Sequence, residues 1–160
     1  MTGLIEKDEL IRYVGRVHAR THEALVLLDD AALGWRPSAA EFSAGELVLH
    51  IINARLMNLE ALQQKHQRYR GHNLSAAATA HDLQKLSLRS GKKVVAGLVD
   101  ADFGVPVPNT GTGSSPAWQR VVGGLIEHEV HHRSQLCSYL TGMGIEAPPL
   151  YGLHVETLPK

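Results

Sequence analysis

The spacing of three histidines in the last third of the chain is suited to metal binding. His128, His131 and His132 lie within five residues, in a run from Gly124 to Gln135 that otherwise has the periodicity of a helix. On a helix, His128 and His132 stand one turn apart and only ~40° apart around the axis, so both imidazoles can bind one transition-metal ion. The same spacing also occurs on solvated faces, so the surrounding elements must distinguish the two interpretations.

The helix that carries this pair is predicted to present it to the core. Ser115 can cap the helix, Pro116 suits its first position, and the helix should end near Thr141, before Gly142 or Gly144. Its inner stripe has aliphatic residues on either side of the pair: Val121, Leu125, His128, His132, Leu136 and Tyr139. His131 lies ~60° around the axis from His128, at the margin of this stripe.

His50 is the third candidate ligand because it lies on the most apolar helix of the sequence. Ser43 and Glu46 form a capping box that begins this helix, which is apolar nearly all round from Leu47 to Leu62. A buried imidazole must satisfy two ring nitrogens, with hydrogen bonds or with a metal. A histidine pair elsewhere in a small bundle favours the metal. The alternative is a metal-free bundle in which hydrogen bonds satisfy three core histidines.

Three imidazoles from two helices would form a facial set of nitrogen ligands. Zinc with three protein ligands keeps a fourth position open for water or substrate, whereas structural zinc closes its shell, usually with cysteine. The single cysteine, Cys137, is nine residues from His128 and so about half a turn out of phase, which predicts a packing role. Nickel or iron would also accept imidazole ligands, so the residues leave the identity of the metal open.

Two kinds of chemistry are open to a metal in such a site. It could lower the pKa of a bound water toward ~7 and generate a hydroxide nucleophile. It could instead deprotonate a bound thiol, and the thiolate would attack an electrophile. The residues alone do not separate the two.

The run from His128 to His132 also matches H-E-x-x-H, a zinc-protease motif in which the glutamate is the general base. The longer H-x-x-G-x-x-H continuation is absent, and a third ligand would have to come from Glu146, His154 or Glu156 in a Pro-rich tail. The sequence does not predict a β-rich half that would supply a substrate-binding strand. The protease is therefore the less favoured hypothesis.

Composition restricts the class of protein further. The 160 residues suit one domain, spanning 1–160, and 16 Lys and Arg balance 16 Asp and Glu. A neutral chain lacks the basic footprint expected for a nucleic-acid partner and the polybasic signal for an anionic membrane surface. One cysteine excludes an internal disulfide, no secretory signal is visible, and no apolar run approaches the ~20 residues of a membrane span. We expect a soluble, cytoplasmic protein with a small-molecule substrate.

The remaining segments predict an all-α, four-helix bundle. We expect a first helix over 6–33, a third over 76–99, and a crossover or lid over 101–115, where prolines and glycines gather. His18 and His22 lie beside the apolar stripe of the first helix and are predicted to be surface or flanking residues. Four helices with three connections make an up-and-down bundle the most economical architecture.

Several of these segments resemble the DinB/YfiT-like superfamily. The resemblance covers almost the full chain, and the residues that carry it are His50, the block His128–Gln135, Tyr139-Leu140, Gly144, Pro148–Gly152, Trp35-Arg36-Pro37 and Ser43–His50. It implies a four-helix bundle with up-down-down-up topology. It also implies a divalent metal, commonly zinc or nickel, held by His50, His128 and His132.

The resemblance also narrows the activities to be considered. Members with an activity are mostly thiol-dependent transferases or isomerases that use a low-molecular-weight thiol such as bacillithiol or mycothiol, and others are labelled metal-dependent hydrolases. Members often form homodimers, and the family does not imply DNA binding. The leading hypothesis is a metal-dependent thiol S-transferase or isomerase that acts on a small electrophile, with the thiol as co-substrate. The alternatives are a hydrolase that uses a metal-bound hydroxide and a metal- or ligand-binding bundle without turnover.

Overall fold

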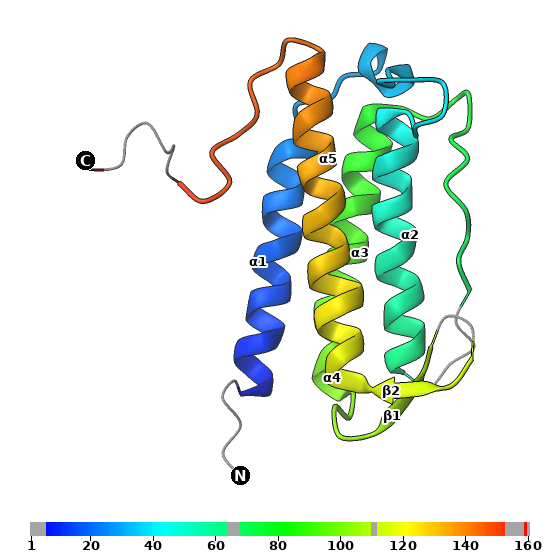
Figure 1. The fold of residues 1–160 in the computed structure, drawn as a ribbon, viewed down its shortest axis with the longest axis vertical. Coiled ribbons are helices and arrows are strands. Elements are labelled where there is room, and N and C mark those ends of the chain that lie inside the picture. The colour runs from blue at the N-terminus through cyan, green and yellow to red at the C-terminus, as the bar shows by residue number, and fades with distance from the viewer. Residues whose placement is uncertain (1–5, 64–67, 110–111, 153–158, 160) are drawn as a thin grey trace.

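The computed structural model describes residues 6–63, 68–109, 112–152 and 159, and these form a bundle of long helices (Figure 1). The helices are α1 (Lys7–Leu25), α2 (Ala44–Leu62), α3 (Ala80–Asp100) and a last helical run made of α4 (Ala117–Arg120), η2 (Val121–Glu127) and α5 (His128–Gly142). In Figure 1, α1 and α5 run one way and α2 and α3 the other, which confirms the predicted all-α, up-down-down-up bundle. Strands among the described residues are limited to a short hairpin of β1 (Pro106–Pro108) and β2 (Ser114–Pro116). No described helix is long and apolar enough to cross a membrane.

The first helix is shorter than the predicted span of 6–33. α1 ends at Leu25, and a short 3-10 helix, η1 (Ala31–Gly34), follows after a turn. Asp29 explains part of this change, because its side chain accepts a hydrogen bond from the backbone N–H of Ala32 at 2.9 Å. Short acidic side chains compete for backbone N–H groups in this way and favour turns over continued helix.

The third helix begins at Ala80 rather than near residue 76. Thr79 caps it, since its hydroxyl accepts a hydrogen bond from the backbone N–H of Asp82 at 3.1 Å. Asp30, from the turn after α1, accepts another from the backbone N–H of Ala80 at 2.6 Å. The start of α3 is therefore held by a side chain of its own and by one from the first connection.

The predicted capping box at the start of α2 is confirmed. Ser43 Oγ accepts a hydrogen bond from the backbone N–H of Glu46 at 3.2 Å, and Glu46 Oε2 accepts one from the backbone N–H of Ser43 at 2.7 Å. Arg36 adds an ion pair to Glu46 at 3.2 Å. These contacts determine where α2 begins, and His50 follows about two turns later.

The segment 101–115, predicted as a crossover or lid, contains the hairpin. Val107 pairs with Ser115 and is fully buried at the end of the bundle. Ser115 was predicted to cap the last helix, but it lies in β2 instead, where its hydroxyl donates to Asn109 Oδ1 at 2.8 Å. The helix starts after Pro116 without a side-chain cap.

The segments α4, η2 and α5 form one continuous helical run, but η2 departs from α-helical geometry. This segment is a π-helix, a form closed by i→i+5 hydrogen bonds and frequent at functional sites. Gly124 permits a close approach of α2 in this segment, because a Cβ there would lie 2.3 Å from Asn58 Oδ1. Asn58 Nδ2 also donates to the Gly124 carbonyl at 3.0 Å, so a side chain of α2 inserts into the hydrogen-bond ladder of the last helix.

Two apolar clusters fill the ends of the bundle and a polar layer separates them. One cluster lies toward η1 and includes Leu25, Leu47 and Leu136, and the other lies toward the hairpin and includes Leu98 and Leu125. The polar layer comprises the buried side chains of Thr21, Arg55, Ser87, Ser90, Glu129 and Arg133. It lies in the middle turns of the helices, beside the three candidate ligands.

Replacing Gly124 by alanine should destabilise the protein by about 1–3 kcal/mol, the usual cost of overpacking, because the new Cβ would collide with Asn58. Gly123→Ala is the matched control, since the nearest heavy atom to its Cβ would be Glu127 Oε2, at 4.0 Å. The control should be neutral or stabilised by up to about 1 kcal/mol through helix propensity. Chemical denaturation followed by circular dichroism measures both free energies of unfolding. Equal values would contradict the role assigned to Asn58.

Candidate metal centre

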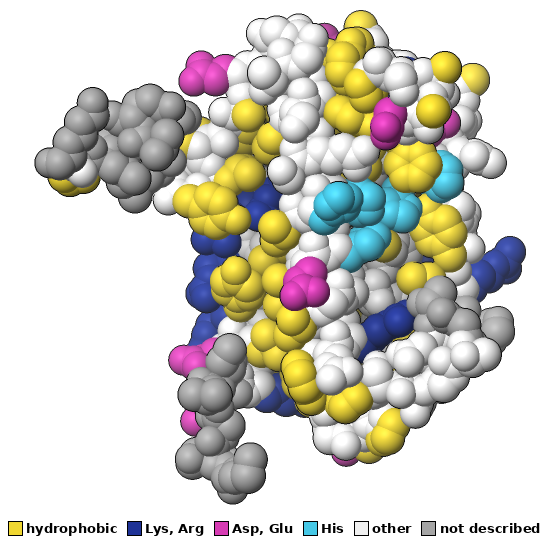
Figure 2. Space-filling model, viewed as in Figure 1, with side chains coloured by type: hydrophobic (Ala, Val, Ile, Leu, Met, Phe, Trp, Pro, Cys, Tyr) yellow, Lys and Arg dark blue, Asp and Glu magenta, His cyan; other side chains and the backbone are white. Residues whose placement is uncertain are grey.

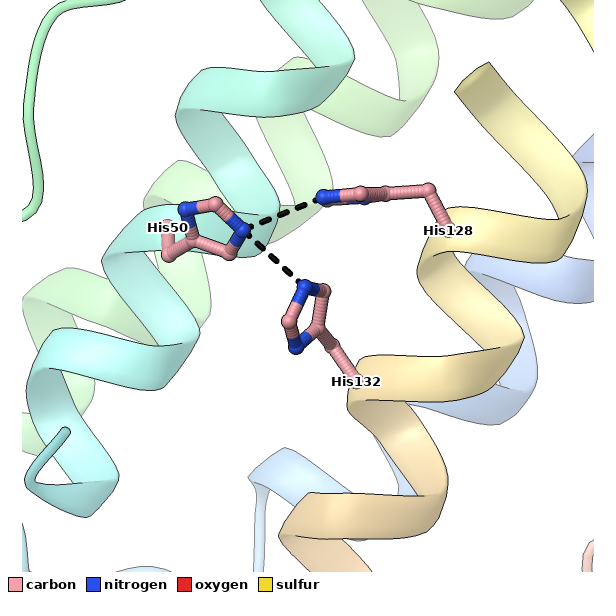
Figure 3. A group of neighbouring side chains, drawn as sticks. All are labelled: His50, His128 and His132. Carbon is pink, nitrogen blue, oxygen red and sulfur yellow. Dashed lines mark hydrogen bonds between the residues drawn. The ribbon is translucent and has the colours of Figure 1, made fainter. Parts of the chain in front are cut away.

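Three imidazoles from α2 and α5 converge on one point (Figure 3). His50 Nε2 lies 3.1 Å from His128 Nε2 and 3.0 Å from His132 Nε2, and one ligand atom from each ring falls within 4.8 Å of the other two. The i, i+4 spacing on α5 and the single histidine of α2 therefore meet as the sequence predicted. These residues form the only group of His, Cys, Asp and Glu side chains, within the described part of the chain, that could hold a metal ion.

The three rings are half-buried, which differs from the prediction that they occupy core positions. Figure 2 shows histidine side chains together on one face of the molecule, at the edge of a hollow. The stripe on α5 is wide enough to reach the surface, so His128 and His132 lie on its outer side while Leu125 and Leu136 are fully buried. A site of this kind is open to small molecules from solution.

The separations of the ring nitrogens fit a shared metal ion. Two nitrogens held at ~2.0–2.1 Å by one zinc lie about 3.3 Å apart in a tetrahedral arrangement and about 2.9 Å apart at right angles. The observed 3.0 and 3.1 Å lie between these values. The ligand atoms of His128 and His132 lie within 4.8 Å of each other, so the donor set could hold a divalent ion after adjustment of the side chains.

Gln135 determines which nitrogen of His132 carries the proton. Its Oε1 lies 3.0 Å from His132 Nδ1, and its Nε2 donates to Tyr139 at 3.2 Å and to the Glu41 carboxylate at 3.5 Å. A carboxylate only accepts, so the amide nitrogen must face Glu41 and the amide oxygen must face His132. His132 then donates from Nδ1, and its Nε2 lone pair points toward the other two rings.

Tyr69 connects His50 to a second histidine outside the cluster. Its hydroxyl lies 2.6 Å from His50 Nδ1 and 2.9 Å from His72 Nδ1, and the ring of Phe42 packs on His72 with centroids 4.2 Å apart. With Tyr69 donating to His72 and accepting from His50, the Nε2 of His50 is also left unprotonated. The sequence did not predict the roles of Tyr69 and His72, because the basic segment 65–73 resembles the solvated end of α2 and a connection. The one available signal was an aromatic residue, Tyr69, among charged residues.

Burial lowers the pKa of all three candidate ligands, to about 4 for His50 and His128. The neighbouring rings act in the same direction on His50, because a charge on one imidazole disfavours a charge on the next. The rings are therefore neutral near pH 7, and each has one unprotonated ring nitrogen that can serve as a ligand. A cation among them would bind these nitrogens without first displacing protons, which is the chemical reason that the group could hold a metal.

Glu129 does not take part in this arrangement. Arg55 Nε donates to its Oε2 at 2.7 Å and Arg55 Nη2 donates to its Oε1 at 2.5 Å, with both side chains 2% exposed. Burial tends to raise the pKa of Glu129, but the charge and hydrogen bonds of Arg55 outweigh it and hold the pKa below its ordinary value. Both carboxylate oxygens are occupied, so Glu129 cannot be the general base that the H-E-x-x-H interpretation requires. The third histidine also comes from α2 rather than from the tail.

His18 lies in the interior, and the prediction of a surface or flanking position for it is wrong. Its side chain is 6% exposed, and its Nε2 lies 3.3 Å from Glu129 Oε2. Helix α1 packs on both α3 and α5, so its buried face is wider than the aliphatic stripe. Burial lowers the pKa of His18 to about 4, and the ring is neutral despite the adjacent carboxylate. His22 is half-buried, as a flanking residue should be.

The other residues considered from the sequence lie outside the cluster. Cys137 packs against the apolar cluster near η1, as predicted, although it is only partly buried, and burial raises the pKa of its thiol. His131 is exposed beside His132, with ring centroids 4.8 Å apart. Two of the tail residues considered as protease ligands, His154 and Glu156, lie outside the described residues.

A cavity of about 680 Å³ opens beside His50 and His128. This volume is within the range of ~300–1,000 Å³ that is usual for small-molecule sites. Helix α2, the last helical run and the hairpin form its walls, with Tyr69 at its edge. The hairpin therefore borders the site, although the sequence could not establish whether this segment covers it.

Glu129→Gln should destabilise the protein by about 3–5 kcal/mol, because it leaves the Arg55 charge buried without its partner. Glu127→Gln makes the same change of charge on an exposed side chain of the same helix and should change the stability by less than about 0.5 kcal/mol. Chemical denaturation measures the difference. Similar stabilities for the two variants would show that the ion pair does not hold the helices together.

The metal-free protein should lose stability as the pH falls from 6.5 toward about 4. Within this interval the unfolded chain binds protons at positions 50 and 128 that the folded protein does not bind, so acid favours unfolding. The free energy of unfolding, measured across this interval, should fall less steeply in His50→Gln, which lacks one of these groups. Identical slopes for the two proteins would contradict the lowered pKa of His50.

Comparison with known proteins agrees with this architecture. The family model described as DinB superfamily matches residues 13–136. No curated protein matches the chain. Among solved structures, a DinB-like protein from Bacillus cereus ATCC 10987 has a TM-score of 0.74 and 18% sequence identity, with 88% of this chain and 94% of that chain covered. The DinB-like protein YjoA from Bacillus subtilis has a TM-score of 0.70 and 21% identity, with 87% and 95% covered.

At these identities the solved structures show a shared fold and no more. The family model is the stronger finding, because it covers most of the chain and includes His50, His128 and His132. Together with the helical bundle described above, it identifies the family. The chain belongs to the DinB superfamily.

Proposed function

We propose that His50, His128 and His132 bind one divalent metal ion, zinc or nickel, and that the protein is a metal-dependent thiol S-transferase or isomerase. The observation that carries the metal site is the convergence of three histidine Nε2 atoms at the edge of a cavity. The thiol chemistry rests on the activities associated with the superfamily and on the groups that the cavity offers. The substrate would be a small electrophile, with a low-molecular-weight thiol as co-substrate.

A divalent ion held by these residues would supply Lewis acidity, which lowers the pKa of a thiol or a water molecule that reaches it. The chain's own part is to orient the ligands. Tyr69 and Gln135 hold the rings of His50 and His132 through their Nδ1 atoms, which keeps the Nε2 lone pairs directed inward. The half-buried position leaves one side of the cluster accessible to the substrate.

The lining of the cavity supports a nucleophile that is supplied by a co-substrate. The described residues that line it include no Asp, Glu, Cys or Lys, and Glu129 is engaged by Arg55. Apart from the histidines that would hold the metal, these lining residues therefore provide no carboxylate or lysine base and no cysteine nucleophile. A thiol that is activated at the metal site needs neither a side-chain base nor a side-chain nucleophile.

Hydrolysis is the second candidate, and the neutral ligand set favours it. Three imidazoles do not reduce the charge of a divalent ion, and the same ligand set occurs where zinc activates water. The same open side of the cluster would serve water or a thiol. A bundle that binds a metal without turnover has these ligands as well, so activity must be measured separately from metal content.

Elemental analysis of the untagged protein should find about one equivalent of divalent metal, as expected for a single three-histidine site. His50→Ala and His132→Ala should each lose most of it, since each removes one of three ligands. His131→Ala, an exposed neighbour of His132, is the matched control and should keep it. Tyr69→Phe should weaken metal affinity by roughly 10–100-fold, because it releases the ring of His50. Stoichiometric metal in His132→Ala would refute the assignment.

Cobalt substitution separates the thiol hypothesis from hydrolysis. A thiol that binds at the metal site should add a strong charge-transfer absorption to the spectrum of the cobalt protein, whereas a site that accepts only water should leave it nearly unchanged. His131→Ala should behave as the parent. An unchanged spectrum at saturating thiol would exclude the transferase and leave hydrolysis or simple binding.

A further inference from the structure

The cavity beside the histidines changes in character along its length. His50 and His128 lie at one end, Ala54 and Met57 line the middle, and Gln119 and Arg120 lie at the hairpin end. The middle offers apolar surface, while the hairpin end offers an amide and a guanidinium. A ligand that fills the cavity therefore meets hydrogen-bonding groups at both ends and apolar groups between them.

The π-helix places the two ends on one side of the same helical run. Arg120, Gly124 and His128 are spaced by four residues, and in an α-helix such positions drift by ~40° at each step. A π-helical turn contains more residues than an α-helical one, which reduces this drift. All three residues consequently line the same cavity, with no side chain at Gly124 to divide it.

The charge of the lining is positive. Arg120 is the only Lys, Arg, Asp or Glu side chain among the described residues that line the cavity. Arg120 is half-buried, so its guanidinium is incompletely hydrated. The acidic group near this wall is Glu127, an exposed residue whose Oε2 lies 4.0 Å from the position of a Cβ on Gly123, at the rim. A divalent ion at the histidines would add to the positive potential.

We propose that this cavity binds a small organic carboxylate with an apolar middle, whose carboxylate is held by Arg120 and whose reactive end lies at the three histidines. The inference rests on the proposed function, because it takes the histidine cluster as the reacting end, and it names the substrate class for that site. A guanidinium can donate two parallel hydrogen bonds to a carboxylate, which recognises shape as well as charge. Because Arg120 and the histidines lie at opposite ends of a cavity of about 680 Å³, the ligand should be elongated rather than compact like acetate.

Binding of simple probes tests this directly. Phenylpropionate, phenylbutyrate and phenylvalerate have an apolar body, a terminal carboxylate and graded length, and their primary amides match them in shape without the charge. Isothermal titration calorimetry on the zinc-loaded protein should show that the best of these carboxylates binds at least about tenfold more tightly than its amide. No binding of any carboxylate at millimolar concentration, or equal binding of acid and amide, would overturn the proposal.

Three variants assign the preference to Arg120. Arg120→Gln should remove the difference between carboxylate and amide, and Arg120→Lys should retain part of it, because the charge remains and the planar fork is lost. Gln119→Glu adds a carboxylate at an exposed position of the same wall and should weaken carboxylate binding several-fold without disturbing the fold. A carboxylate preference that survives in Arg120→Gln, or that is unaffected in Gln119→Glu, would contradict the assignment.

His132→Ala separates failure of this inference from failure of the proposed function. The carboxylate preference should persist in this variant, because Arg120 lies at the other end of the cavity. A preference lost in His132→Ala but kept in Arg120→Gln would mean that the probe's carboxylate binds at the metal, which overturns the inference and supports the metal site. A preference that depends on Arg120 in a protein that binds no metal would support the inference and refute the proposed function.

Discussion

The buried ion pair between Arg55 and Glu129 is the contact on which the geometry of the site depends. Arg55 lies little more than one turn after His50 on α2, and Glu129 lies between the two ligands of α5. Two hydrogen bonds between side chains that are each 2% exposed hold these helices at one distance and one rotation. The imidazoles of His50, His128 and His132 can meet on the outer side of the same turns because the inner side is locked in this way.

The polar layer contains charged side chains, whereas the histidine cluster consists of neutral ones. In the interior, Arg55 and Glu129 neutralise each other, and Ser87 and Ser90 accept the remaining guanidinium hydrogen bonds. On the outer side the donors are neutral imidazoles, so a metal ion would keep its full charge toward the cavity. The α2–α5 interface therefore supplies structural charge on one side and an electrophilic site on the other, without a carboxylate that could serve both.

The features that the sequence predicted depend on residues within one or two helical turns. The capping box at the start of α2 and the i, i+4 spacing on α5 are of this kind, and His50 could be added because an imidazole on so apolar a helix needs a partner. Contacts between residues that are far apart in the sequence could not be predicted from it. Tyr69 reaches His50 from a connection 19 residues away, and the burial of His18 follows from the packing of α1 on two other helices. The π-helix needs Asn58 of α2, which no local pattern in 121–127 could indicate.

The length of the π-helical segment controls where the chain that precedes it lies. A π-helical turn accommodates one residue more than the α-helical turn that it replaces. Deletion of one residue between Val121 and Glu127 would restore an α-helix and rotate the preceding chain by ~100° relative to His128. The three histidines and their supporting hydrogen bonds would stay in place, while Arg120 and the hairpin would leave the cavity. A chain one residue shorter in this stretch would therefore keep every histidine ligand and lose the Arg120 wall of the cavity.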